Sequence, residues 1–128
     1  MAWSFLQATK QARADLITTQ IGAGGHLGVW SAAYANLLVE WTFTANMFAA
    51  ATAVPQPQLV MNQPTPNPMV PALSGTAALA RISNAARTSY IVSDMTVGTT
   101  GTDVIISNIA ISTSTPVSLN SMTITEAL

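Results

Sequence analysis

Hydrophobic and polar residues alternate most clearly in the stretch L-L-V-E-W-T-F-T, which runs from Leu37 to Thr44. A period of two indicates a strand with one face on a core and the other face partly solvated. The stretch therefore predicts a strand whose inner face carries the apolar residues of one phase, namely Leu37, Val39, Trp41 and Phe43.

Two runs rich in β-branched residues, Asp103–Ile111 and Val117–Thr125, fill most of the last third of the chain. Val, Ile and Thr favour the pleated surface of a sheet, and Ser-Thr-Ser-Thr-Pro joins the runs. The apolar positions change phase within the second run, as happens when one extra residue enters a strand. We therefore expect an antiparallel C-terminal hairpin with a β-bulge near Asn120 and Ser121.

Four further segments have the pattern of short strands separated by turn residues. They are Leu27–Ser31, Gln58–Asn62 as an edge strand, Gly75–Ser83, and Ser89–Met95 as its hairpin partner. This series favours an all-β fold, an antiparallel β-sandwich of jelly-roll type with about seven to eight strands. At 128 residues the chain is expected to form one domain, residues 1–128, with hairpins filling residues 75–125.

The segment Ser4–Gln20 is the helical candidate. Ser4 and Gln7 have the spacing of a capping box, and Gly22 lies just beyond the expected end. The apolar stripe is expected to comprise Phe5, Ala8, Ala12 and Leu16, with Ile17 beside it. Residues 1–22 are therefore either a helix packed on the sheet or an arm that docks on a neighbouring subunit.

Six prolines lie between Pro55 and Pro71, inside the irregular segment 45–73. Proline lacks an N–H group and fixes φ, which excludes a continuous helix or a central strand here. The segment is expected to be extended and close to polyproline II. Two interpretations stay open, a connection within the domain and a loop that lies along a partner.

Charged residues make up 7% of the chain, compared with about 25% in ordinary soluble proteins. Because 49% of the residues are hydrophobic, the surface must be poorly protected against association, and we infer that other subunits cover much of it. A net charge of −1 offers no basic patch for nucleic acid. Prolines interrupt the apolar stretches well before the ~20 residues of a membrane span, and no signal-peptide pattern opens the chain.

Residue types that commonly carry catalysis are few and scattered. The chain has no cysteine and one histidine, His26, at the end of the glycine-rich turn I-G-A-G-G-H. That turn lacks the Gly-Lys-Ser/Thr ending of a phosphate loop, and the five acidic residues lie in different segments. His26 is expected to face solvent. We expect no enzyme activity, no cofactor and no metal site.

A turn bracketed by Gly98 and Gly101 precedes the first C-terminal run, where positive φ is easiest for glycine. Asp103 follows at the strand entrance, and its carboxylate is expected to accept hydrogen bonds from nearby backbone N–H groups. Arg81 stands in an otherwise uncharged strand. It is expected either to pair with Asp94 or Asp103 or to face a partner subunit.

Three stretches of the chain follow one another as G-T-A-A-L-A-R (75–81), V-G-T-T-G-T-D-V-I-I (97–106) and V-S-L-N-S-M-T-I-T (117–125). Together they resemble a family of small virion proteins of tailed bacteriophages. That family has a GTA…R strand, a V-G-T-S-G-x-D turn followed by hydrophobic positions, and a closing V-S-V-x-S-hydrophobic-T-hydrophobic-T strand. The Pro-rich segment departs from this pattern, since the family usually has a shorter, glycine-containing stretch there.

The resemblance implies a jelly-roll-like capsid cement or decoration protein, made in the host cytoplasm and located on the exterior of the virion. The implied partners are the major capsid protein and further copies of the chain, as a dimer or trimer at a symmetry axis, without nucleic acid or membrane. A tail or fibre component and a carbohydrate-binding module are the alternative functions. The residues expected to contact a partner are Trp3, Phe5, Leu6, Leu59, Met61, Met69 and Val70.

Overall fold

The computed structural model describes residues 7–52, 58–64 and 67–125. Within these residues one helix, α1 (Gln7–Ile21), precedes a series of short strands, and a 3-10 turn, η1 (Ala32–Tyr34), joins the first two of them. The strands are β1 (His26–Trp30), β2 (Leu37–Thr42), β3 (Gln58–Val60), β4 (Gly75–Thr76), β5 (Leu79–Ser83), β6 (Tyr90–Gly98), β7 (Val104–Ile106), β8 (Ala110–Ile111) and β9 (Leu119–Thr125). The protein is mainly β with one short helix, which confirms the predicted fold class.

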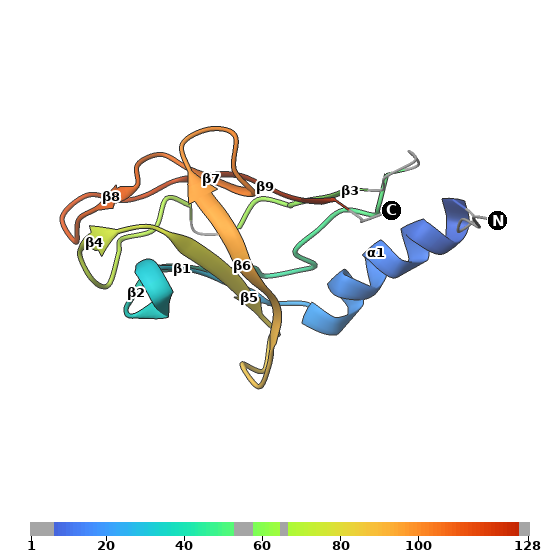
Figure 1. Cartoon of the computed structure of the whole chain (residues 1–128). Coiled ribbons are helices and arrows are strands. Elements are labelled where there is room, and N and C mark those ends of the chain that lie inside the picture. Colours follow the sequence, from blue (N-terminus) through green and yellow to red (C-terminus); the bar gives the residue numbers. More distant parts are fainter. Residues whose placement is uncertain (1–6, 53–57, 65–66, 126–128) are drawn as a thin grey trace.

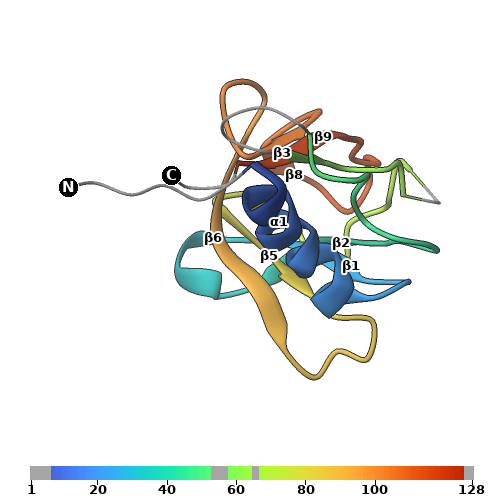
Figure 2. The same cartoon turned by 90° about the vertical axis from the view of Figure 1, so that its right-hand side faces the viewer.

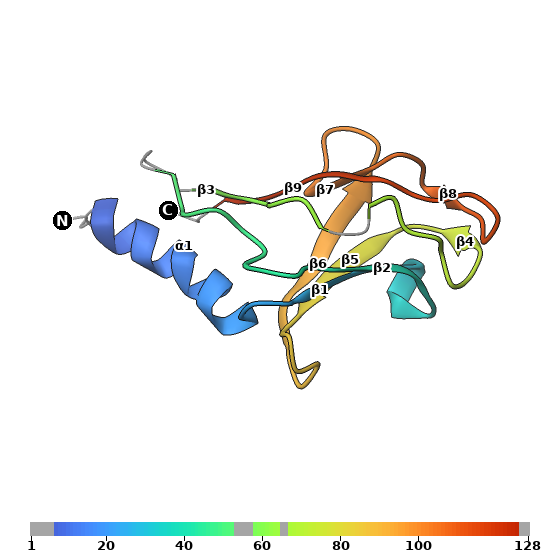
Figure 3. The ribbon, with the colours of Figure 1, turned by 180° about the vertical axis from the view of Figure 1, so that it is seen from behind.

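Seven strands form one mixed sheet in the order β2-β1-β5-β6-β7-β9-β3, and β4 pairs with β8 in a separate sheet. The large sheet curls into a half-barrel, so that β1, β2 and β5 lie below β9 and β3 in Figure 1 while β6 crosses between the layers. Figure 3, seen from behind, shows β3 alongside β9 in the upper layer. This arrangement agrees with the expected sandwich-like fold.

Two antiparallel halves make up the large sheet, β2-β1-β5-β6 and β7-β9-β3. A short parallel pairing of β6 with β7 joins them, through Val97 with Val104 and Gly98 with Ile105. The sheet is therefore not wholly antiparallel as expected. The cause is the loop of residues 99–103, which turns back on itself and returns the chain alongside β6 in the same direction (Figure 1).

The hydrophobic core lies between the two layers. Fully buried side chains from β1, β2 and β5 in one layer meet those from β3, β7 and β9 in the other. Each such burial stabilises the fold by roughly 1.5–3 kcal/mol. The largest of these side chains are Leu27, Leu38, Trp41, Ile82, Leu59, Ile106, Leu119 and Met122.

Helix α1 covers one end of the half-barrel, in front of the strands in Figure 2. Ala14 and Ile21 are buried in the core and Ile17 packs against it. Ala12 is exposed and Leu16 is 52% exposed. The predicted stripe over Ala12 and Leu16 is therefore wrong, and the helix faces the core about half a turn away from it.

Polar contacts with Ala51 explain this rotation of α1. The backbone N–H of Ala51 donates to Asp15 Oδ1 over 2.8 Å, and Gln11 Nε2 donates to the Ala51 carbonyl over 3.3 Å. Hydrogen bonds to a charged acceptor contribute about 1.5–3 kcal/mol. The side of the helix between Gln11 and Asp15 is thereby held toward the segment that precedes the Pro-rich stretch.

Strand β2 keeps only part of its predicted alternation. The three expected inner residues between positions 39 and 43 are buried, but Leu37 is half-buried and Leu38 is 1% exposed. The pairing of β1 with β2 shifts between Val29 and Trp30, which leaves one extra residue in β2. This irregularity turns Leu38 inward, against the simple period of two.

The predicted bulge in the closing strand is confirmed. Ile105 pairs with Ser121 and Ile106 with Leu119, so Asn120 has no partner across the pair of strands. The C-terminal hairpin of β7 and β9, the β5–β6 hairpin and the edge strand β3 are confirmed as well. The expected strands 75–83 and 103–111 are each divided, because β4 and β8 leave the large sheet to pair with each other.

Segments at either end of the Pro-rich stretch bond to the edges of the large sheet, along β3 and at Leu38 of β2. Beside β3, Ala49 N–H donates to the Val60 carbonyl over 3.0 Å, and Thr52 N–H donates to the Gln58 carbonyl over 3.1 Å. Beside β2, the Leu38 carbonyl accepts a hydrogen bond from Ala72 N–H over 2.8 Å. The described parts of segment 45–73 are therefore built into the domain.

Candidate functional site

The residues expected to contact a partner differ in accessibility. Trp3, Phe5 and Leu6 lie outside the described residues. Leu59 is fully buried in β3, so the expectation of a surface contact at Leu59 is corrected: its side chain fills the core. Met61 and Met69 are partly buried against the core, and Val70 is 63% exposed.

The turn residues lie between β6 and β7. Gly101 has a φ of +68°, whereas Gly98 ends β6 without positive φ. Asp103 Oδ2 accepts hydrogen bonds from the backbone N–H and the Oγ1 hydroxyl of Thr96, each over 3.1 Å, and Asp103 N–H donates to Thr96 Oγ1 over 3.0 Å. Asp103 thus ties the loop to β6.

A pocket lies on the outer face of the half-barrel, over β2, β1 and β5. The strand pairing lines up the row Glu40–Gly28–Arg81 across this face. Gly28 lets the Trp30 and Leu37 side chains pack over the middle of the row, because a Cβ there would lie 2.9 Å from Trp30 Nε1 and 3.0 Å from Leu37 Cδ1. The pocket has a volume of about 210 Å³.

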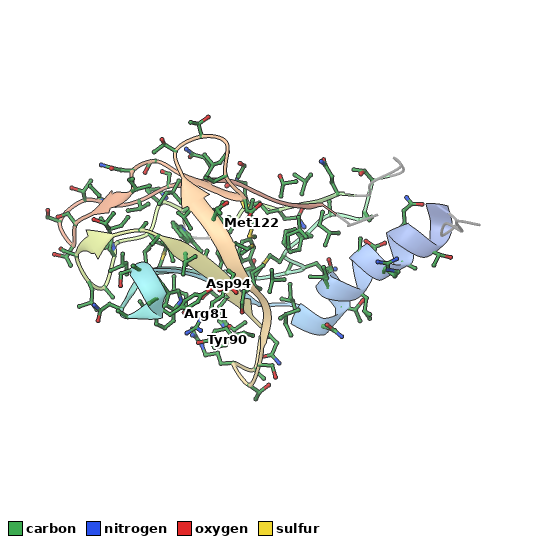
Figure 4. All side chains as sticks on the ribbon, viewed as in Figure 1. Arg81, Tyr90, Asp94 and Met122 are labelled. Carbon is green, nitrogen blue, oxygen red and sulfur yellow. The ribbon has the colours of Figure 1, made fainter. Side chains whose placement is uncertain are left out.

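Arg81 lies against three aromatic rings at this pocket. Its Cζ atom is 4.3 Å from the ring centroid of Trp30, 4.2 Å from that of Tyr34 and 3.9 Å from that of Tyr90. Attraction between a guanidinium and an aromatic face stabilises such contacts by about 0.5–2 kcal/mol. Figure 4 shows Arg81 and Tyr90 side by side below β5 and β6.

No ion pair joins Arg81 to Asp94 or Asp103, so the first of the two expected alternatives for Arg81 is wrong, and contact with a partner subunit stays a prediction. Asp94 instead bonds to Tyr34, whose hydroxyl donates to Asp94 Oδ1 over 2.8 Å and accepts from Asp94 N–H over 2.6 Å. Burial, followed by the hydrogen bond to Asp94, raises the pKa of the Tyr34 phenol above its ordinary value. Tyr34 is thereby fixed as one wall around Arg81.

Backbone strain gathers around the same pocket. The non-glycine residues with positive φ in the described part of the chain are Ala33 (56°), Tyr34 (57°), Arg87 (58°) and Asp94 (59°). Arg87 lines the pocket, Tyr34 contacts Arg81, Asp94 holds Tyr34, and Ala33 precedes it in η1. Each such conformation costs about 1–3 kcal/mol, and strain of this kind often clusters at binding sites.

Arg87 and Glu40 close one side of the pocket with a two-pronged ion pair. Arg87 Nη2 lies 2.6 Å from Glu40 Oε1, and Arg87 Nη1 lies 3.0 Å from Glu40 Oε2. The hydrogen bond to Glu40 raises the pKa of the Arg87 guanidinium. The charge of Arg87 is thus largely matched by a carboxylate of the protein itself.

His26 is buried, at 8% exposure, and does not face solvent as expected. Its Nδ1 atom lies 3.0 Å from Thr42 Oγ1 and 3.4 Å from Arg87 Nη2, while Nε2 lies 3.4 Å from the Ala85 carbonyl oxygen. A carbonyl only accepts, so this arrangement places the proton on Nε2 and leaves Nδ1 to accept. His26 is the first residue of β1, where it pairs with Thr42 on one side and Ser83 on the other. The turn of residues 84–89 covers its side chain.

Among the described residues, no three side chains of His, Cys, Asp or Glu come together in a way that suits a metal ion. The described part of the chain also contains no helix with the length and apolar character of a membrane span. Comparison with protein-family models, with curated proteins and with solved structures found no match to this chain.

Sequence patterns did not indicate the aromatic cluster around Arg81. Trp30, Tyr34 and Tyr90 come from three segments, and only the pairing of β1 with β5 brings Gly28 and Arg81 side by side. Alternation along the strands was the one sequence feature that pointed to this face. His26, Gly28 and Trp30 share one face of β1, and Arg81 and Ser83 share one face of β5. An arginine and a tryptophan on outward faces indicate a polar-aromatic surface, but their meeting depends on strand order.

Proposed function

We propose that this protein is a structural component of a phage virion that binds the exterior of an assembled capsid, bridges neighbouring major capsid subunits and so stabilises the head. The resemblance of residues 75–125 to small virion proteins motivates this role. A protein that binds only the assembled shell stabilises it by mass action, since a site shared between subunits exists only after assembly. Many weakly bound copies then act together.

The supporting observation in the structure is exposed apolar surface on the Pro-rich segment and its flanks. Val60, Val70 and Leu73 are 45%, 63% and 47% exposed. Val60 lies apart in β3, but Val70 and Leu73 lie three residues apart beside β2, and neighbouring exposed apolar side chains mark surface that a partner covers. The segment is already anchored to the edges of the sheet, so its ordering on binding costs little.

The test is binding to matching capsids that lack this protein, followed by sedimentation and heating. Saturable co-sedimentation with a higher melting temperature of the particle is expected. Val70→Asp with Leu73→Asp should weaken binding at least tenfold, whereas Ala86→Asp adds a charge to an exposed residue in the distant β5–β6 turn and should leave it unchanged. No binding to shells, together with self-association into rings or trimers, would overturn the proposal in favour of a tail or fibre component.

A further inference from the structure

The Arg81 guanidinium is held in a fixed position at the pocket. It forms no hydrogen bond or ion pair with any described residue, and its Nε atom is buried without a partner. A buried donor without a partner costs about 1–3 kcal/mol, so a fold rarely keeps one without a reason. The rings of Trp30, Tyr34 and Tyr90 hold the group in place without using its N–H donors.

Arg81 also lines the pocket, which is open to a ligand. A planar guanidinium held against rings is preorganised for a planar oxyanion, because two parallel N–H···O bonds form with little loss of side-chain freedom. The pocket contains two arginines and Glu40, so their formal charges leave one positive charge. A singly charged carboxylate matches this balance, whereas a phosphate dianion would meet repulsion from Glu40.

The remaining lining suits a ligand rich in hydroxyl groups. Ser83, Thr88 and Ser89 offer hydroxyls, and Glu40 keeps acceptor capacity beyond its two bonds to Arg87. Leu37 and the ring of Trp30 add an apolar wall for the C–H face of a sugar ring. The volume of about 210 Å³ is below the ~300–1,000 Å³ of sites for drug-sized ligands, so one ring is the appropriate size.

We propose that this pocket binds an acidic sugar, a single hexuronate unit, with its carboxylate on Arg81 and its hydroxyls on Glu40 and the neighbouring serine and threonine side chains. The inference rests on the pocket alone and holds whether or not the protein sits on a capsid. It adds recognition of an acidic glycan to a protein proposed above as structural.

Titration of the native, full-length protein by two-dimensional ¹H–¹⁵N NMR tests the proposal with three probes. Glucuronate should give saturable shifts at pocket residues such as Gly28, Ser83 and Ser89. Glucose has the ring without the carboxylate, and propionate has the carboxylate without the ring, so each should bind at least tenfold more weakly. Equal binding of glucose, equal binding of propionate, or no saturation with glucuronate would each overturn the proposal.

Variants of Arg81 locate the carboxylate. Arg81→Gln should weaken glucuronate binding at least tenfold, and Arg81→Lys should also weaken it, because the charge remains while the planar pair of donors is lost. Arg13→Gln removes an equal charge from α1, which does not line the pocket, and should bind as the native protein does. Native affinity in a folded Arg81→Gln variant would contradict the assignment. If that variant does not fold, the three-probe comparison on the native protein still decides.

Discussion

Tyr34 and Asp94 hold each other in left-handed backbone conformations, which are uncommon for residues other than glycine and most costly here for the bulky Tyr34. The phenol and the carboxylate are sixty positions apart, yet together they fix one wall of the Arg81 cluster. Asp94 lies where β6 gains an extra residue against β5, between the pairs Ala80–Met95 and Ile82–Val92. A single side-chain pair therefore stabilises both the irregularity in β6 and the shape of the pocket.

Tyr34→Phe is expected to lower the free energy of unfolding by about 1 kcal/mol at neutral pH, because it removes the hydroxyl bonded to Asp94. The folded pKa of Tyr34 is raised, so the unfolded chain ionises first as the pH rises. The contribution is complete below about pH 10 and is lost as the pH rises through the folded pKa. Urea denaturation at a series of pH values from neutral to above 10 should show the difference in free energy of unfolding between the native and Tyr34→Phe proteins decreasing as the pH rises.

Tyr90→Phe is the control for this prediction. Tyr90 contacts Arg81 as Tyr34 does, but its hydroxyl forms no hydrogen bond with any described residue. The free energy of unfolding of the Tyr90→Phe variant at neutral pH should equal that of the native protein. Equal losses in both variants would show that the bond to Asp94 is not the cause.

At the scale of single residues, sequence patterns predicted conformations that depend on near neighbours. The positive φ of Gly101 follows from turn chemistry, and the strand entrance at Asp103 from the same rule. The burial of His26 and the neighbours of Arg81 depend on residues from other strands. Such neighbours are set by sheet order and register, which a local pattern does not contain.

Among the elements, α1 shows how a weak pattern gives way to tertiary contacts. Its sequence has many alanines and threonines, so several faces are almost equally apolar. Contacts of Asp15 and Gln11 with Ala51 then decide which face turns inward. The strand patterns were more reliable, because the phase change in β9 could only be accommodated by an unpaired residue at Asn120.

Ala14→Leu should therefore destabilise the protein by about 2 kcal/mol, because Ala14 is 2% exposed and the added atoms overpack the core. Ala12→Leu, made on the exposed side of the same helix, should change stability by less than about 0.5 kcal/mol. Helix propensity changes equally in both. Thermal melting of the two variants compares them directly, and a larger loss for Ala12→Leu would mean that the helix packs by the originally predicted stripe.

Deletion of Asn120 is expected to preserve the fold. It removes the unpaired residue and leaves Leu119 and Met122 on one face of a regular strand. Deletion of Thr123 removes a paired residue of the same strand and moves Ile124 away from Leu59, with an expected loss of more than about 2 kcal/mol. In circular dichroism melts, the Asn120 deletion should melt near the native temperature and the Thr123 deletion well below it. If the Asn120 deletion melts lower than the Thr123 deletion, the bulge is not a dispensable insertion.

In the whole molecule, a two-pair parallel contact between β6 and β7 would be a weak joint if the halves of the large sheet did not share a core. They do share one. Met122 points from β9 into the interior (Figure 4) and is fully buried, in the same cluster as Trp41 from the other half. Packing between the two layers therefore stabilises the junction of the two halves, which backbone pairing connects through only two residue pairs.

Met122→Ala should lower the free energy of unfolding by about 3 kcal/mol through the cavity that it leaves. In a Trp3→Phe background, tryptophan fluorescence reports on Trp30 and Trp41 in the other half. Its transition should shift as much as that of the circular dichroism signal. Thr100→Ala, in the exposed 99–103 loop, serves as a control without effect. A fluorescence midpoint that stays in place while the dichroism shifts would mean that the halves unfold separately.

The edges of the large sheet bear on how the protein behaves when it is crowded. An open edge invites the backbone of another copy to add as a further strand, and fibres grow in this way. Proteins often repel that approach with charge, which this chain has in only 7% of its residues. Here Ala49 and Thr52 bond beside β3, and Ala72 bonds beside β2. Strand addition beside β3 must therefore first displace the chain's own backbone, which raises the barrier to fibre growth there, whereas the protection beside β2 is limited to Leu38.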